Sequence, residues 1–131
     1  MLGANDSKEE NWNKDFYHQD LYDLVLSYLQ LDSKPTLYLM IPFRIENTEG
    51  VKIMRMQPDV IENVIPPIMK EITKKLNNRL IDLSHLFSDP KDHDRIFQKG
   101  EEGYWTGDGV HPTDDGYKRL ATYIHDNLKL R

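Results

Sequence analysis

The chain contains no cysteine among its 131 residues. That absence excludes a disulfide framework, a thiolate metal site and a cysteine nucleophile, and it leaves the redox compartment of the protein open. The sequence also has no apolar run near the roughly 20 residues that a membrane-spanning helix requires, and it has no internal repeat. The formal net charge is -5. Because the basic residues are scattered, nucleic acid is not an expected partner.

The remaining composition fits one folded domain with regular structure. Five segments carry the apolar spacing of helices or the short apolar runs of buried strands. They are a helix over residues 13–31, a strand over 36–42, a helix over 59–78 broken or kinked by Pro66 and Pro67, a strand over 79–84, and a helix capped by Thr113. Residues 43–57 and the stretch from the second strand to Val110 are expected to be long loops.

The first and the last of the three predicted helices each have an apolar face. In the first helix the apolar positions are Phe16, Tyr17, Leu21, Leu24, Val25, Tyr28 and Leu29. In the last helix the positions expected to face inward are Tyr117, Leu120, Ala121, Ile124 and Leu128.

The order helix, strand, helix, strand, helix predicts an α/β fold with a parallel sheet. Both strands read as apolar on both faces, which is typical of strands buried in a parallel sheet. Two such strands with three helices leave a sheet edge and parts of its faces uncovered, and an isolated pair of strands is marginally stable. We therefore expect the exposed edge of 36–42 to pair with another chain or with a second copy.

The sequence "DGVHP" places Asp108 three residues before His111. A carboxylate at this spacing can hold an imidazole in one tautomer and stabilise its charged form, which makes the histidine a general base. Gly109 allows the turn between them to bend tightly. The alternative is that Asp108 only caps a turn and that His111 is a surface histidine, and the motif by itself leaves both interpretations open.

The sequence "GAND" near the start contains Gly3, Asn5 and Asp6. An asparagine amide at a tight turn can donate a hydrogen bond to a developing oxyanion. Gly3 allows close backbone approach, and Asp6 can brace the loop through backbone hydrogen bonds. The alternative is an ordinary turn, since these three residue types are common in turns.

Two tryptophans, Trp12 and Trp105, lie close in sequence to these two motifs. Their aromatic faces suit an acyl or a sugar pocket, although each could simply pack its own loop. The other histidines show no ligand spacing with one another, and no metal site is predicted from the sequence.

Together, "LGANDSKEENW" and "DGVHPTDDGY" resemble the third and fifth sequence blocks of the SGNH hydrolases, the GDSL-type lipases and esterases. The segments between them follow in the family's order. The resemblance implies a three-layer α/β/α sandwich with a flavodoxin-like parallel sheet, of which residues 1–131 form the C-terminal part of a single domain that lacks its N-terminal strands. The form "NDSK…NW" looks most like the branch that contains carbohydrate acetylesterases.

The resemblance also implies a role for each matching residue. His111 is the general base, Asp108 orients it, and Asn5 donates to the oxyanion hole within the turn that Gly3 and Asp6 form. The substrate is a small O-acyl ester, such as an acetylated sugar. Neither a metal nor an organic cofactor is implied.

The chain departs from the family because the Gly-Asp-Ser block that carries the nucleophile is absent. None of its serines sits in a strand-to-helix elbow; they are Ser7, Ser27, Ser33, Ser84 and Ser88. We therefore expect Met1 to be internal to a longer hydrolase and the chain to be inactive alone. The alternative is a non-catalytic pseudoenzyme or interaction module that pairs its strand edge with itself or with a complementing chain.

Overall fold

Two strands form a parallel pair in the computed structural model, which describes residues 2–89, 91, 97 and 108–128. Strand β1 (Tyr38–Ile41) lies beside strand β2 (Arg79–Asp82), with the first residues of the two strands opposite each other. Both strands are shorter than the predicted 36–42 and 79–84. The predicted mixed α/β organisation with parallel strands is confirmed.

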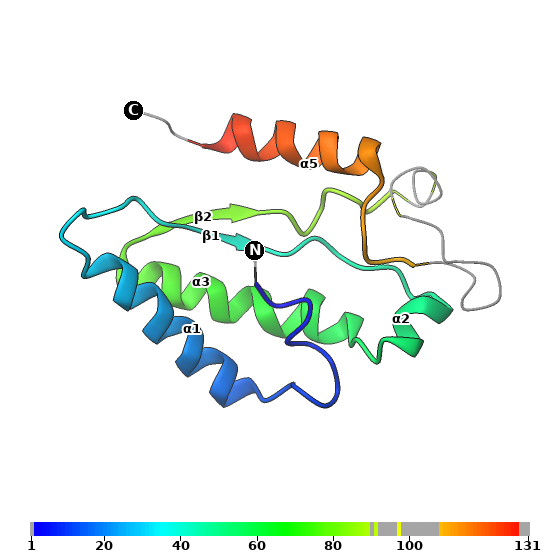
Figure 1. Cartoon of the computed structure of the whole chain (residues 1–131), viewed down its shortest axis with the longest axis horizontal. Coiled ribbons are helices and arrows are strands. Elements are labelled where there is room, and N and C mark those ends of the chain that lie inside the picture. The colour runs from blue at the N-terminus through cyan, green and yellow to red at the C-terminus, as the bar shows by residue number, and fades with distance from the viewer. Residues whose placement is uncertain (1, 90, 92–96, 98–107, 129–131) are drawn as a thin grey trace.

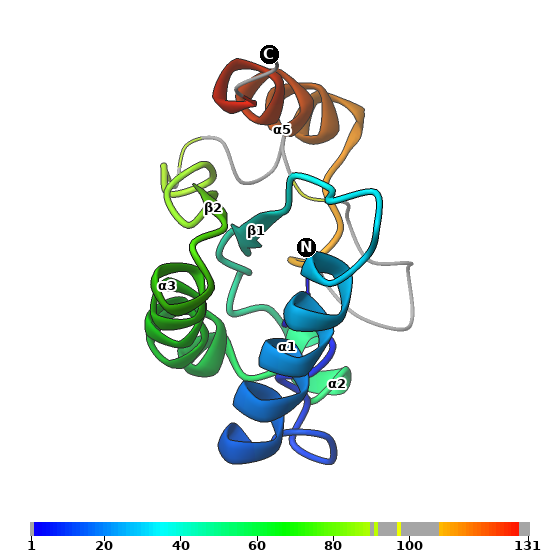
Figure 2. The same ribbon diagram turned by 90° about the vertical axis from the view of Figure 1, so that its left-hand side faces the viewer.

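The helices lie on both sides of this strand pair. They are α1 (Lys14–Leu29), α2 (Glu49–Ile53), α3 (Ile65–Leu76) and α5 (Asp114–Asn127), with a π-helical turn η1 (Val60–Val64) directly before α3. Figure 1 shows α1 and α3 on one side of the strands and α5 on the other. Figure 2, turned by 90°, shows the same separation, with the strands between α5 and the α1–α3 pair.

Strand β1 is less buried than its sequence predicts. Of its four residues only Ile41 is buried, while Tyr38, Leu39 and Met40 are half-buried. Within the described residues β1 pairs with β2 alone, so its other edge has no strand beside it. The prediction of a fully buried strand is therefore wrong in this structure, because burial on both faces requires a wider sheet.

Helix α1 begins where the sequence predicts, with Asn13 as its N-cap. The Asn13 side chain accepts hydrogen bonds from the backbone N–H groups of Asp15 and Phe16, both at 3.0 Å. The helix ends two residues before the predicted 31. Its buried side chains, Tyr17, Leu21 and Val25, are spaced four residues apart and form one row.

The broad apolar face predicted for α1 is wrong. Phe16, Leu24 and Tyr28 lie outside the buried row and are exposed, Phe16 by 70%. The apolar positions of this helix cover more of its circumference than the neighbouring elements bury. The result is a row of exposed apolar side chains next to the buried row of α1.

The predicted break at Pro66 and Pro67 is confirmed. Residues Val60–Val64 form the wider π-helical turn, and α3 begins immediately afterwards with proline in its first turn. A proline is tolerated there because the N–H groups of the first turn have no intrahelical partner. Helix α3 ends at Asn77, whose φ of 52° is left-handed, a common helix terminus.

The segment 43–57 is not the uninterrupted loop that the sequence predicts. It contains the short helix α2, whose N-cap is Thr48. The Thr48 side chain accepts a hydrogen bond from the backbone N–H of Val51 at 3.2 Å. The segment thus acquires a rigid turn just beyond the carboxyl end of β1.

Helix α5 has the predicted cap, since the Thr113 side chain accepts a hydrogen bond from the backbone N–H of Gly116. The predicted inward face is only partly right. Tyr117 and Ala121 are exposed, whereas a row of side chains from α5 and its C-cap packs toward the sheet; the row consists of Leu120, Tyr123, Ile124 and Leu128. Because the two described strands form a narrow sheet, they cover only this row of side chains and leave Tyr117 and Ala121 exposed.

The core consists of two apolar clusters, one on each side of the strands. The larger, which we call the first core cluster, contains buried side chains of α1, η1, α3 and the segment after β1; they are Tyr17, Leu21, Val25, Ile41, Ile45, Val51, Met56, Val60, Ile61, Ile65, Ile68, Met69 and Ile72. The second core cluster, on the α5 side, contains Phe43, Ile81, Leu83, Leu86, Phe87 and Phe97.

Candidate active site

The structure brings Asp108 and His111 together in one tight turn before α5. His111 Nδ1 lies 2.8 Å from Asp108 Oδ2. The other carboxylate oxygen, Oδ1, accepts hydrogen bonds from the backbone N–H groups of Val110 at 2.8 Å and His111 at 2.6 Å. Because an ionised carboxylate can only accept hydrogen bonds, the neutral His111 ring carries its hydrogen on Nδ1 and leaves Nε2 free to take up a proton.

The two side chains of the pair differ strongly in exposure. The Asp108 side chain is only 9% exposed, whereas the His111 side chain is 56% exposed. The carboxylate is therefore fixed within the fold, while the ring that it holds is open to a reactant. Burial raises the pKa of Asp108, but hydrogen bonds from the His111 side chain and from the backbone outweigh it, so the net pKa lies below its ordinary value.

This lowered pKa predicts how the turn contributes to stability as pH changes. A carboxyl group with a folded-state pKa below its unfolded value stabilises the fold fully above the unfolded value and loses that contribution as pH falls through the folded value. We expect the difference in unfolding free energy between wild type and Asp108→Asn to shrink as pH falls below the ordinary value of 3.8. Urea unfolding across this range measures it.

The matched control for that titration is Asp126→Asn. It removes the same charge from an exposed carboxylate that also lies beside a histidine, with His125 Nδ1 3.3 Å from Asp126 Oδ1. A wild-type advantage over Asp108→Asn that grows as pH falls would contradict the assigned direction, because it would mean that folding raises the Asp108 pKa.

Gly109 occupies a position that other residues do not fit. Its φ is +69°, and a Cβ there would lie 2.8 Å from Thr48 Oγ1 and 2.9 Å from Glu46 Cβ. The Gly109 carbonyl also accepts a hydrogen bond from the backbone N–H of Glu46 at 2.8 Å. The turn that holds the Asp108–His111 pair therefore packs closely on the segment after β1.

We expect Gly109→Ala to destabilise the fold by about 1–3 kcal/mol, because it combines left-handed backbone strain with a contact too short for a methyl group. Chemical denaturation measures the loss. Gly109→Asn separates the two causes, since asparagine tolerates positive φ but brings the same Cβ. Equal losses in the two variants assign the effect to the contact with Thr48 and Glu46, and an unchanged stability in Gly109→Ala would contradict the close packing.

The N-terminal turn contains the other predicted residues. Gly3 is buried with φ +124°, and its N–H donates to Asp6 Oδ2 at 3.0 Å, so Asp6 braces the turn as the sequence suggests. Asn5 is exposed. Its backbone carbonyl accepts hydrogen bonds from Lys8 N–H and Asn11 Nδ2, each at 3.3 Å, while its side-chain amide has no partner among the described residues.

Both turns are held by the same stretch of chain. Residues 46 and 48 contact the Asp108–His111 turn, and further along the same stretch Gln57 Nε2 donates to the Ser7 carbonyl at 3.0 Å, with Lys8 pairing to Met56. Figure 1 shows the orange segment before α5 beyond the tips of the two strand arrows, and the dark blue N-terminal turn near the middle of the view. No hydrogen bond or ion pair joins Asn5 to His111 within the part of the chain that the structure describes.

Trp12 is half-buried and packs against the first core cluster, with its ring centroid 5.3 Å from that of Tyr17. It lines a cavity of about 320 Å³ between the N-terminal turn and α1, together with Asp6 and Phe16 among others. Neither Asn5 nor His111 lines this cavity. Trp105, predicted to line a substrate pocket with Trp12, lies outside the described residues.

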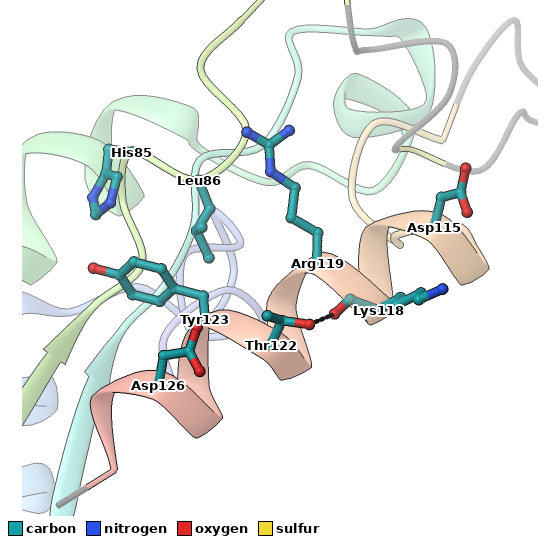
Figure 3. A pocket seen from close by; sticks show the side chains of 8 residues that line it. All are labelled: His85, Leu86, Asp115, Lys118, Arg119, Thr122, Tyr123 and Asp126. Carbon is teal, nitrogen blue, oxygen red and sulfur yellow. Dashed lines mark hydrogen bonds between the residues drawn. The ribbon is translucent and has the colours of Figure 1, made fainter.

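A larger cavity than the one beside Trp12 lies away from the candidate residues. It measures about 630 Å³ and is bounded by α5 and by His85 and Leu86 after β2. Figure 3 shows its wall of side chains, in which the His85 ring approaches Tyr123, with centroids 5.3 Å apart. Apart from buried Leu86 and half-buried Tyr123 these side chains are exposed, so the cavity is a gap beside the loosely packed α5 and not an enclosed pocket.

Four serine hydroxyls donate hydrogen bonds to acceptors other than His111. Ser7 and Ser27 donate to backbone carbonyls of Ala4 and Leu24, both at 2.7 Å. Ser84 donates to the Asp82 carboxylate at 2.6 Å, and Ser88 donates to the His85 carbonyl. None of these four hydroxyls donates to His111, as a serine nucleophile activated by that histidine would.

Thr48 is the residue of this site that sequence reasoning missed. Its hydroxyl donates to the Asp108 carbonyl at 3.2 Å, across 60 positions of sequence. The local signal was a threonine directly before the acidic Glu49 and an apolar segment, which is typical of a helix N-cap.

Within the described ranges, no three histidine or acidic side chains gather in the manner of a metal site. No helix in those ranges is long and apolar enough to cross a membrane. Comparison of the chain with protein-family models and with curated proteins gave no match.

Proposed function

We propose that the chain carries the acid–base half of a serine ester hydrolase of the SGNH type. The observation that carries the proposal is the 2.8 Å contact between His111 Nδ1 and the nearly buried Asp108 carboxylate, with the rest of the imidazole exposed. In such a site Asp108 fixes the ring and stabilises it when it is charged, and His111 Nε2 exchanges the proton. The exposed amide of Asn5 is the proposed oxyanion donor.

In the proposed reaction His111 transfers one proton in each of two steps, acylation of the serine and its deacylation by water. Nε2 first takes the proton of a serine hydroxyl as its oxygen attacks the acyl carbon, and it then gives that proton to the departing alcohol. A water repeats the cycle and releases the acid. The substrate is a small O-acyl ester, such as an acetylated carbohydrate, and the serine comes from outside these 131 residues because none of the five present lies in a nucleophile elbow.

The arrangement of the helices supports the corresponding fold proposal. With α5 on one side of the strands and α1 and α3 on the other, the described elements suit one edge of a three-layer α/β/α sandwich with a flavodoxin-like sheet. The further strands would lie beside β1, whose second edge is unpaired within the described residues. The chain would then be the C-terminal part of one SGNH-hydrolase domain.

The experiment that tests this function uses the native protein that contains the sequence. It is captured from its own cells with antibodies to the chain, treated with a fluorophosphonate, and mapped by mass spectrometry. We expect the label on a serine other than the five present here, either on a longer polypeptide or on a chain that stays bound. Loss of labelling in His111→Ala, but not in His18→Ala, assigns the activation to His111.

A second candidate function is a non-catalytic interaction module, and the specific observation in its favour is uncovered apolar surface. The edge of β1 that has no strand beside it within the described residues, and the exposed Phe16, Leu24 and Tyr28 of α1, suit association with a copy or with another chain. A native species of 15.5 kDa per chain with no labelled serine and concentration-dependent association in sedimentation would favour this module. A labelled serine excludes it.

A further inference from the structure

We propose that Thr48 is a positioning residue for the Asp108–His111 pair, so that its hydroxyl sets the orientation of the imidazole. The use of that orientation in ester hydrolysis rests on the proposed function, but the positioning itself is a property of this chain. The hydrogen bonds of the Thr48 hydroxyl go to the backbone of Val51 and Asp108, and not to the His111 ring. Thr48 acts through the backbone of Asp108.

The Thr48 hydroxyl makes two hydrogen bonds that only a hydroxyl can combine at this place. As N-cap of α2, its Oγ1 accepts from the backbone N–H of Val51 at 3.2 Å. The same oxygen donates its hydrogen to the Asp108 carbonyl at 3.2 Å. A hydroxyl has one hydrogen and two lone pairs, so both bonds form together, and the helix cap fixes where the donated hydrogen points.

Within the described residues, the bond to Asp108 is one of two hydrogen bonds that tie the backbone of this turn to the segment after β1. The carbonyls of two successive residues, Asp108 and Gly109, accept from the Thr48 hydroxyl and the Glu46 N–H. Asp108 then holds the His111 ring through its own carboxylate. Since His111 is more than half exposed, packing does little to hold the ring, and its orientation follows that of Asp108.

The test measures the tautomer of His111 by nitrogen NMR in the full 131-residue chain, without substrate. In wild type we expect nearly all of the neutral ring in the Nδ1–H form. Thr48→Ser keeps both hydrogen bonds and should keep that form. Thr48→Val keeps the shape but loses the hydroxyl, and we expect the ring to shift to a mixture of both neutral tautomers.

The matched control is Asn13→Ala, which removes the cap of α1 and leaves Thr48 in place. We expect it to leave the His111 tautomer as in wild type. An unchanged tautomer in Thr48→Val overturns the proposal, and so does an equal shift in Asn13→Ala, which would trace the effect to general loosening of the fold.

A measurement on the wild-type chain decides the matter if Thr48→Val does not fold. A slowly exchanging Thr48 hydroxyl proton with a nuclear Overhauser contact to the Gly109 Hα supports the proposal, and rapid exchange without that contact overturns it. Neither experiment involves ester hydrolysis. The positioning role and the proposed esterase function can therefore fail independently.

Discussion

Asp108→Asn is expected to lower kcat of the proposed esterase by about 10⁴-fold, the loss typical of this change in a serine–histidine–aspartate triad. The structure gives the reason. Asp108 Oδ1 accepts two backbone N–H groups, so an asparagine keeps its carbonyl oxygen there and turns its NH₂ group toward His111 Nδ1. The ring must then accept at Nδ1 and carry its hydrogen on Nε2, where it cannot take up the serine proton.

Two measurements check this prediction at different levels. Ester hydrolysis by the native protein gives kcat, and nitrogen NMR of His111 shows the reversed tautomer in the chain alone. The matched control is Asp126→Asn, which alters an exposed aspartate beside His125 and should leave both readouts unchanged. If Asp108→Asn reverses the tautomer but leaves kcat intact, His111 is not the general base.

The parts of this site that the sequence predicts are those formed by neighbours along the chain. Asp108 and His111 are three residues apart with a glycine between them, so a local turn brings them together. The Thr113 cap and the break at Pro66 and Pro67 are also local. In each case the backbone preferences of a few adjacent residues decide the structure, and no distant contact can easily override them.

The features that the sequence does not predict depend on distant contacts or on the extent of the sheet. The bond from Thr48 to Asp108 joins residues 60 positions apart, and no local pattern marks its acceptor. The exposure of Phe16 and Tyr117 follows from how much surface the two strands offer, which an apolar pattern on a helix cannot reveal. Such a pattern shows which side chains favour burial and not whether a partner covers them.

Ile72→Ala should cause the largest loss of stability among the substitutions considered, about 2–5 kcal/mol. Ile72 lies on α3 and is fully buried in the first core cluster. Truncating it removes apolar contacts and leaves a cavity that the surrounding helix and strand residues fill only in part. Since small domains unfold with only about 5–15 kcal/mol, the transition midpoint in urea should fall markedly with little change in slope.

Ile53→Ala is the matched control for that loss, because Ile53 is 54% exposed at the end of α2 and its truncation should change stability by no more than about 0.5 kcal/mol. Equal losses in the two variants would contradict the assignment of the core. Ala4 and Val110, one from each candidate turn, pack against the same cluster. Since the same cluster supports both turns, Ile72→Ala should reduce the folded fraction of the chain, which the urea midpoint measures.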